Sequence, residues 1–209
     1  MEPREVNEAA EAKQALRRRF RAARLAMPPE ARAQTATALC AALRALPELA
    51  HVRSVHAYWP ATDRGEPDLR PLLRAWHGDC VEIVLPRVAT RTPPTLAHHV
   101  WDGRDPAVSD FGLAEPAPTL PLADLARLDA VLVPALAVDA CGTRLGYGGG
   151  FYDAFLAALA AGPSPPVLVC AVPEACVADA PLPREPHDRP VHLVVTERRV
   201  RRVGEPFLP

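Results

Sequence analysis

Several features that would place a protein in a specialised class are missing from this sequence. The five cysteines, Cys40, Cys80, Cys141, Cys170 and Cys176, are odd in number and form no CxxC pair, which argues against a disulfide framework or zinc site and for a reducing compartment. The formal net charge is −1, so no overall field draws the protein to nucleic acid. No apolar run is long enough to cross a bilayer, and the charged N-terminal segment lacks the apolar core of a signal peptide. We therefore expect a cytoplasmic monomer without nucleic-acid or membrane partners.

Lysine and glycine are both unevenly used. Of the 24 basic residues only Lys13 is a lysine, which is either retained for its chemistry or left by chance in an arginine-rich composition. Five of the eleven glycines fall within residues 142–150, in the segment GTRLGYGGGFYD. Glycine gives up side-chain packing but permits positive φ and close approach of a ligand to the backbone, so this cluster marks either a tight turn or a binding loop.

The order of the expected elements points to one α/β domain over residues 1–209, with flexible tails at 1–7 and 204–209. A pair of N-terminal helices is predicted first, over residues 8–27 and 29–46, separated by Pro28 and Pro29. Strands and helices then alternate, which favours a three-layer domain with a mostly parallel sheet and helices on both faces. We expect strands within 53–60, 81–86, 95–101, 128–139, 165–172 and 191–197, and helices within 66–78 and 151–161.

The glycine cluster lies between a buried strand and a helix, where free N–H groups and the helix dipole favour an anion such as phosphate. It matches neither a P-loop nor a dinucleotide fingerprint, because no Lys-Ser/Thr follows the glycines and Phe151 replaces the third glycine of the fingerprint. In an open α/β sheet, ligands bind beyond the carboxyl ends of the strands. Trp59, Arg87 and the glycine loop are expected at that edge.

Charged residues around this edge have two interpretations each. Lys13 and Arg17 are four apart on one helix face and suit a polyphosphate. The alternative is a solvated basic face, because four more arginines follow: Arg18, Arg19, Arg21 and Arg24. Arg144 can neutralise a phosphate. Asp153 either favours the helix dipole or holds Mg²⁺ beside phosphates, and Asp188 is a turn residue or a second magnesium ligand.

Glu66 and the aromatic residues before it form another candidate site. Glu66 is either a helix-start carboxylate or an anchor for the N–H groups of a heterocycle, with Trp59 or Tyr58 as the packing surface. The histidines show no metal-ligand spacing.

These segments occur in the order seen in one known family. KQALRRRFRAARLAM, YWP…GEPD, LPRV, FGLAEP, LDAVLVPALAVDACGTRLGYGGGFYDAFL and HDRPVHLVVTE resemble the 5-formyltetrahydrofolate cyclo-ligase (5,10-methenyltetrahydrofolate synthetase) family from Lys13 to Glu197. The resemblance implies an ATP- and Mg²⁺-dependent conversion of 5-formyltetrahydrofolate to 5,10-methenyltetrahydrofolate, releasing ADP and phosphate, without a catalytic nucleophile from the protein.

The resemblance also implies roles for individual residues. Asp153 and Asp188 correspond to magnesium ligands, and the following residues correspond to ATP contacts: Lys13, Arg17, Arg144, Leu145, Gly146, Tyr147, Gly148, Gly149, Gly150, Phe151 and Tyr152. Folate contacts correspond to Trp59, Glu66, Tyr147, Gly148, Gly149, Gly150 and Phe151.

The sequence departs from the family pattern at three positions and in one spacing. Ala135 and Val138 replace a glycine and an aromatic residue, His192 replaces an aspartate, and the segment between Tyr58 and Glu66 is longer by about two residues than the usual spacing. Two rival interpretations remain open at this point: a non-catalytic nucleotide- or folate-binding relative, and a sugar-phosphate isomerase or acyl-transfer enzyme on a similar scaffold.

Overall fold

The computed structural model of the chain describes residues 3–162, 164–185 and 188–204, with side chains described from residue 11 onward. The helices are α1 (Pro3–Ala26), α2 (Pro29–Arg44), α3 (Arg70–Gly78) and α4 (Phe151–Ala160), with short 3-10 turns η1 (Pro47–Leu49), η2 (Thr62–Arg64), η3 (Leu125–Arg127) and η4 (Glu174–Cys176). The strands are β1 (Ser54–His56), β2 (Glu82–Arg91), β3 (Pro94–Val100), β4 (Ala107–Val108), β5 (Ala114–Glu115), β6 (Ala130–Leu132), β7 (Ala137–Asp139), β8 (Arg144–Leu145), β9 (Val167–Ala171), β10 (Val177–Ala178), β11 (Leu193–Val195) and β12 (Val200–Arg202).

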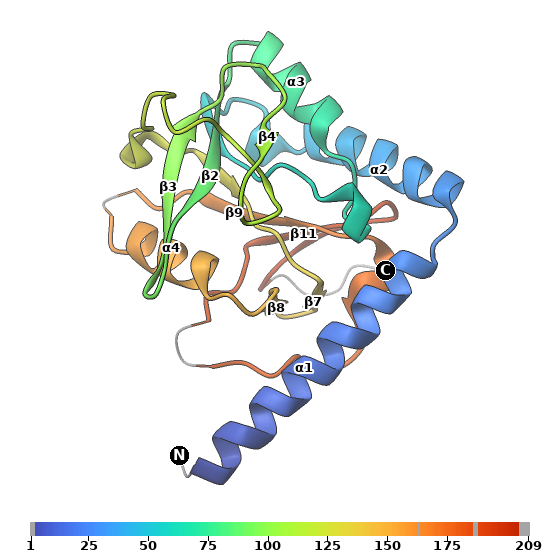
Figure 1. Cartoon of the computed structure of the whole chain (residues 1–209). Helices are drawn as coiled ribbons and strands as arrows, with labels where there is room; N and C mark the ends of the chain where they lie inside the picture. Colours follow the sequence, from blue (N-terminus) through green and yellow to red (C-terminus); the bar gives the residue numbers. More distant parts are fainter. Residues whose placement is uncertain (1–2, 163, 186–187, 205–209) are drawn as a thin grey trace.

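A mixed, mostly parallel sheet forms the centre of the domain (Figure 1), in the strand order β12-β11-β9-β6-β1-β2-β3. The five inner strands are mutually parallel, and the two edge strands run antiparallel to their neighbours. The predicted α/β class with a mostly parallel sheet is confirmed. Edge strand β12 was not anticipated, because its sequence VRR is mostly charged and has no apolar periodicity.

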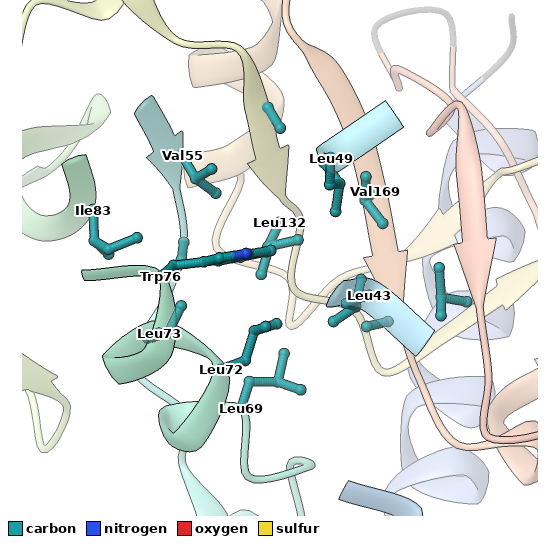
Figure 2. Close-up of a cluster of buried hydrophobic side chains, with 14 of the residues drawn as sticks. Leu43, Leu49, Val55, Leu69, Leu72, Leu73, Trp76, Ile83, Leu132 and Val169 are labelled. Atoms are coloured by element: carbon teal, nitrogen blue, oxygen red, sulfur yellow. The ribbon is translucent and has the colours of Figure 1, made fainter. Parts of the chain in front are cut away.

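Helices cover both faces of this sheet, as predicted. On β1, β2 and β6, Val55, Ile83 and Leu132 face α2 and α3, and pack with Leu43 and Trp76 in one apolar cluster (Figure 2). The residues that alternate with them face α4 instead. Successive side chains of a strand point to opposite faces, so Val84 and Val131 belong to a second cluster with Phe155 and Leu156 of α4.

Helix α1 is held beside the glycine loop by a small accessory sheet in the order β10-β7-β8. Phe20 of α1 packs with Ala137 and Leu145 of this sheet, and Leu16 lies against the same cluster. The sequence predicted one buried strand over 128–139 that leads directly into the glycine loop. Instead β6 ends at Leu132, and residues 137–139 form β7 of the accessory sheet. The β7–β8 hairpin places the loop next to α1 as well as α4.

Other expectations concern the tails, the membrane and the cysteines. Of the expected flexible tails, residues 1–2 and 205–209 lie outside the described residues, and α1 already begins at Pro3. In the described part of the chain, we find no helix with the length and apolar character needed to cross a bilayer. All five cysteines are free, in agreement with the expectation of no disulfide framework.

Candidate active site

A cavity of about 650 Å³ opens where strands β1 and β6 end at the edge of the main sheet. Tyr58 follows β1 and Pro134 follows β6, and both line it. Every residue for which the sequence suggested a binding role lines this cavity: Lys13, Arg17, Trp59, Glu66, Arg144, Leu145, Gly146, Tyr147, Gly148, Gly149, Gly150, Phe151, Tyr152, Asp153 and Asp188. A second cavity of similar volume, between α2 and η4, contains none of them.

The glycine loop forms one wall of the cavity and leads into the N-terminus of α4. Gly148 and Gly150 have φ of 96° and 71°, in the left-handed region that favours glycine. A Cβ atom on Gly148 would lie 3.3 Å from the Arg17 guanidinium carbon. The loop backbone therefore runs directly beneath a cation, with the N-terminus of α4 beside it, which is an arrangement suited to phosphate.

Asp139, which the sequence did not single out, anchors the turn that precedes this loop. One carboxylate oxygen accepts hydrogen bonds from the backbone N–H of Cys141 (2.8 Å) and Thr143 (2.9 Å), and the other accepts from Leu182 N–H (2.8 Å). A buried carboxylate that accepts three backbone N–H groups is a rigid structural element. The available signal was the glycine–threonine pair three and four residues after this aspartate.

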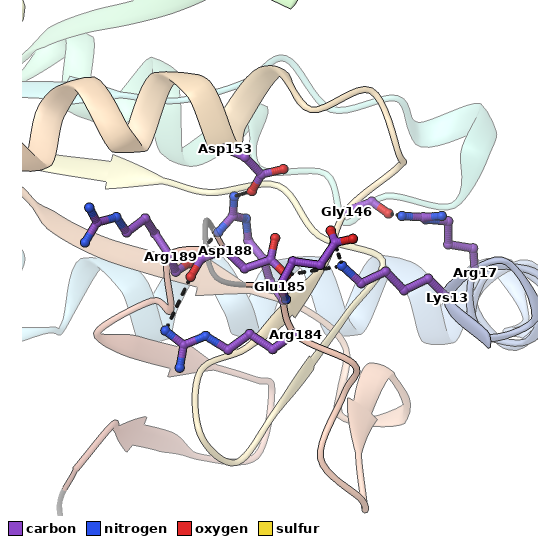
Figure 3. A network of polar contacts seen from close by, with 9 residues as sticks. Lys13, Arg17, Gly146, Asp153, Arg184, Glu185, Asp188 and Arg189 are labelled. Carbon is purple, nitrogen blue, oxygen red and sulfur yellow. Dashed lines mark hydrogen bonds and ion pairs between the residues drawn. The ribbon is translucent and has the colours of Figure 1, made fainter. Parts of the chain in front are cut away.

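We call Lys13, Arg17, Arg144, Asp153 and Asp188 the charged half of the cavity. Lys13 is buried, and its ammonium contacts Asp188 Oδ2 at 3.2 Å as well as Glu185 Oε2 at 2.8 Å (Figure 3). Arg144 pairs with Asp153, and Arg17 Nε donates to the Gly146 carbonyl at 3.0 Å. Three cations from α1 and β8 thus converge on one wall, each held by an oxygen that phosphate oxygens can replace.

The two aspartates of the charged half are compatible with magnesium as a companion of polyphosphate. Within the residues that the structure describes, no three or more His, Cys, Asp or Glu side chains are grouped as a metal site. Magnesium usually takes one or two carboxylates together with phosphate oxygens and water. Asp153 and Asp188 line the same cavity from different segments, so they fit a metal that arrives with its phosphates rather than a metal bound by protein alone.

We call Trp59, Glu66 and Tyr147 the Glu66 half of the cavity. Glu66 accepts hydrogen bonds from Ala61 N–H (2.7 Å) and from the Tyr147 hydroxyl. Burial raises the pKa of Glu66, and these two hydrogen bonds partly offset that effect. Burial also raises the pKa of Tyr147 well above its usual value, so this phenol stays protonated and donates.

The longer spacing between Tyr58 and Glu66 is accommodated by a compact turn. Residues 62–64 form η2, which ends at Gly65 in the left-handed conformation, with φ of 76°. The hydrogen bond from Ala61 N–H to the Glu66 carboxylate closes the loop. Trp59 lies against Trp101, with ring centroids 5.5 Å apart, while lining the cavity.

Arg24 corrects one expectation from the sequence, in which it belonged to a solvated basic face. Arg18, Arg19 and Arg21 are exposed, but Arg24 has only 1% of its surface accessible. It lies seven residues after Arg17 and four after Phe20, so it shares their face of α1. That spacing was the signal that distinguished it from its neighbours.

Comparison with known proteins identifies the relatives of this chain. Residues 9–197 match the model of the 5-formyltetrahydrofolate cyclo-ligase family. A 5-formyltetrahydrofolate cyclo-ligase of Mycolicibacterium smegmatis (strain ATCC 700084 / mc(2)155) is 42% identical over 92 residues, or 44% of this chain and 45% of that protein. The matched stretch therefore spans less than half of the relative's length.

Two solved structures share the fold. The NMR structure of Aquifex aeolicus 5,10-methenyltetrahydrofolate synthetase superposes with a TM-score of 0.78 and 28% identity, covering 94% of this chain and 95% of that one. A 5,10-methenyltetrahydrofolate synthetase from Mycoplasma pneumoniae gives a TM-score of 0.68 over 88% of this chain and 98% of that one. At 18% identity, the second likeness shows the fold alone.

Proposed function

The chain belongs to the 5-formyltetrahydrofolate cyclo-ligase family, and we propose that it carries out the reaction for which the family is named. In that reaction 5-formyltetrahydrofolate and ATP give 5,10-methenyltetrahydrofolate, ADP and phosphate. The observation that carries this proposal is that a wall of three cations and a glycine loop faces the same cavity as a partly buried carboxylate among aromatic residues. Such a cavity accommodates a polyphosphate beside a heterocycle.

We assign the nucleotide to the charged half. Lys13, Arg17 and Arg144 would neutralise the phosphates, and the backbone from Leu145 to Tyr152 would approach them closely because its glycines carry no side chains. Asp153 and Asp188 would hold Mg²⁺, which would spread the negative charge of the phosphates.

We assign the formyl substrate to the Glu66 half. The Glu66 carboxylate would accept hydrogen bonds from the N–H groups of the heterocycle, and Trp59 would supply an apolar surface beside it. The loop from Tyr147 to Phe151 borders both halves, so it would contact both substrates. This shared border would bring the formyl oxygen and the γ-phosphate together.

The chemistry requires alignment more than a protein nucleophile. The formyl oxygen attacks the γ-phosphorus, and the bond to ADP breaks. The neighbouring folate nitrogen then attacks the activated formyl carbon and loses its proton, and the C–O bond breaks to release phosphate. The role of this chain's residues is to orient the two substrates and to neutralise the charge that moves to ADP. We therefore assign no covalent catalytic residue.

A single assay separates this proposal from its rivals. We expect the absorbance band of the methenyl product to appear when the protein, 5-formyltetrahydrofolate and Mg-ATP are combined, and not when either nucleotide or magnesium is omitted. Binding of both ligands without product would indicate a non-catalytic relative. Product formation without ATP would contradict the assigned reaction. A cytoplasmic monomer is sufficient for this activity, and sedimentation at the chain mass of 22.5 kDa would test the monomer.

A further inference from the structure

Arg24 is a buried cation whose described hydrogen-bond partners are all neutral. One of them is the thiol of Cys176, whose pKa is raised by burial. Arg24 Nη2 donates to the backbone carbonyl of Ala135 at 2.6 Å and to that of Leu136 at 3.2 Å. Its Nη1 donates to the Tyr147 hydroxyl oxygen at 3.1 Å. A buried guanidinium costs free energy unless its charge is compensated, and the carboxylate reached through these contacts is Glu66, one hydroxyl group further on.

The donor and acceptor pattern fixes the direction of this chain of hydrogen bonds. A guanidinium has only donors, so the Tyr147 oxygen must accept from Arg24. The hydroxyl hydrogen is then directed to Glu66, which accepts it. If Glu66 were protonated, its own hydrogen could occupy the place of the hydroxyl hydrogen between the Tyr147 oxygen and the Glu66 carboxyl oxygen. Arg24 thus favours the ionised, acceptor-only form of Glu66.

The aliphatic part of Arg24 also supports the loop that carries Glu66. A Cβ atom on Gly65 would lie 3.0 Å from the Arg24 Cγ atom. The stem of Arg24 therefore packs directly beneath the residue before Glu66, while its head reaches Glu66 through Tyr147. Arg24 therefore supports this segment in two ways, directly at Gly65 and through Tyr147 at Glu66.

We propose that Arg24 is a positioning residue for the formyl substrate: acting through Tyr147, it holds the Glu66 carboxylate ionised and oriented toward the cavity. This inference rests on the proposed function, in which Glu66 accepts hydrogen bonds from the heterocycle. Arg24 itself does not line the cavity in the described structure, so its effect on the substrate passes through the two residues that do.

None of the other charged and titratable groups that act on Glu66 supplies a buried positive charge in place of Arg24. They are Arg64 and the phenols of Tyr58, Tyr147 and Tyr152. Burial raises the pKa of each of these three phenols, so they are neutral at physiological pH. Arg64 is exposed, and solvent and salt screen its charge. Because burial raises the pKa of Glu66, loss of the buried cation would favour protonation.

The first test is the pH dependence of turnover in Arg24→Met, which keeps most of the side-chain length and removes the charge. We expect kcat/KM for 5-formyltetrahydrofolate to fall by about tenfold or more near neutral pH, with the acid limb of its pH profile moved to higher pH. The KM for ATP should change much less. Arg18→Met, which removes an exposed arginine of the same helix, should leave the profile unchanged.

Two further variants cover the possibility that Arg24→Met does not fold. Tyr147→Phe breaks the relay while keeping the ring, and should move the acid limb in the same direction. Arg24→Lys keeps the charge and should return the limb toward its wild-type position. A loss of activity that is equal at every pH in Arg24→Met and Tyr147→Phe would indicate a merely structural role and overturn the proposal.

A measurement on the free protein separates this inference from the proposed function. Carbon-13 NMR of protein labelled at glutamate carboxyl groups follows the titration of Glu66, whose signal is assigned by its loss in Glu66→Gln. We expect the Glu66 titration to move to higher pH in Arg24→Met and Tyr147→Phe but not in Arg18→Met. An unmoved titration would overturn the inference even in an active enzyme, whereas absence of turnover in the wild type with a moved titration would overturn only the function.

Discussion

The charged half and the Glu66 half of the cavity differ in how their partly desolvated charged groups are paired. In the charged half, Lys13 and Arg144 are paired with carboxylates, and a polyphosphate can take over those contacts when it binds. In the Glu66 half, the carboxylate is fixed by hydrogen bonds from Ala61, Tyr147 and, indirectly, Arg24. Under the proposed assignment, the nucleotide would bind by exchange of ionic partners, while the heterocycle would bind to acceptors already in place.

The largest expected effect is at the border of the two halves. Gly148→Val would place a β-branched residue at φ of 96°, with its Cβ 3.3 Å from the Arg17 guanidinium carbon. We expect turnover to fall more than about 100-fold, because both substrates would be displaced. Product absorbance and thermal melts measure this. The control is Gly78→Ala, because a Cβ atom on Gly78 would meet no atom within 4 Å. Full activity in a folded Gly148→Val protein would show that the loop is a simple turn without a binding role.

We expect Asp153→Asn to impair the charged half of the cavity without affecting the Glu66 half. If Asp153 is a magnesium ligand, turnover should fall about 10- to 100-fold and the magnesium concentration for half-maximal rate should rise, with Asp188→Asn acting in the same direction. If Asp153 only favours the dipole of α4, stability alone should change, by about 0.3–1 kcal/mol. Magnesium titrations decide between the two. Asp79→Asn, which removes an exposed carboxylate paired with Arg44, is the control.

Removing the cations of α1 should weaken nucleotide binding without affecting the Glu66 half. Loss of a charge-assisted contact in Arg17→Ala should cost about 1.5–3 kcal/mol of ATP binding. Lys13→Ala should cost more than Arg17→Ala, because it also leaves the cavity without the cation beside Glu185 and Asp188. Calorimetry with ATP and with 5-formyltetrahydrofolate tests the contrast, with Arg18→Ala as the exposed control. If all three variants bind ATP with the affinity of the wild type, this face of α1 is only a solvated basic face.

The smallest expected effect concerns the packing beneath α4, which carries Asp153. His56 Nε2 and His98 Nδ1 lie 3.1 Å apart under Phe155. Burial is the main reason that the pKa of His98 is lowered from 6.5 to about 4, and the neighbouring His99 contributes to the same shift. The unfolded chain therefore takes up this proton at higher pH than the folded one, so stability is full above about pH 6.5 and declines as the pH falls toward 4.

Urea midpoints measured between pH 7 and pH 4 test this support. The decline should be smaller in His98→Gln, which has no group that titrates in this range. Burial also lowers the pKa of His56, so a decline of the same size in wild type and His98→Gln would assign the pH dependence to His56 or to the carboxylates instead.

Much of the domain was predictable because its local signals are strong. The Pro28–Pro29 break, the apolar segments over 128–133 and 165–172, and the apolar stripe of the last helix each appear in the structure close to their expected places. The short strands β4, β5, β8, β10 and β12 were not predicted, and β7 was expected only as the end of one strand over 128–139. They have two or three residues each, too few for a periodicity, and they form because a neighbouring strand is available for pairing.

The layered α/β fold and the glycine loop could be predicted from the sequence, because hydrophobic periodicity and the glycine cluster are local properties of the chain. The contacts of the charged side chains depend on the tertiary structure. Lys13 meets Asp188 across 175 residues of sequence, and Arg24 meets Tyr147 across 123. Helical spacing shows which side chains share a face of α1 but not what that face contacts. The charge of Arg24 was therefore visible in the sequence, whereas its burial against Tyr147 and Gly65 depends on how α1 packs on the β7–β8 hairpin.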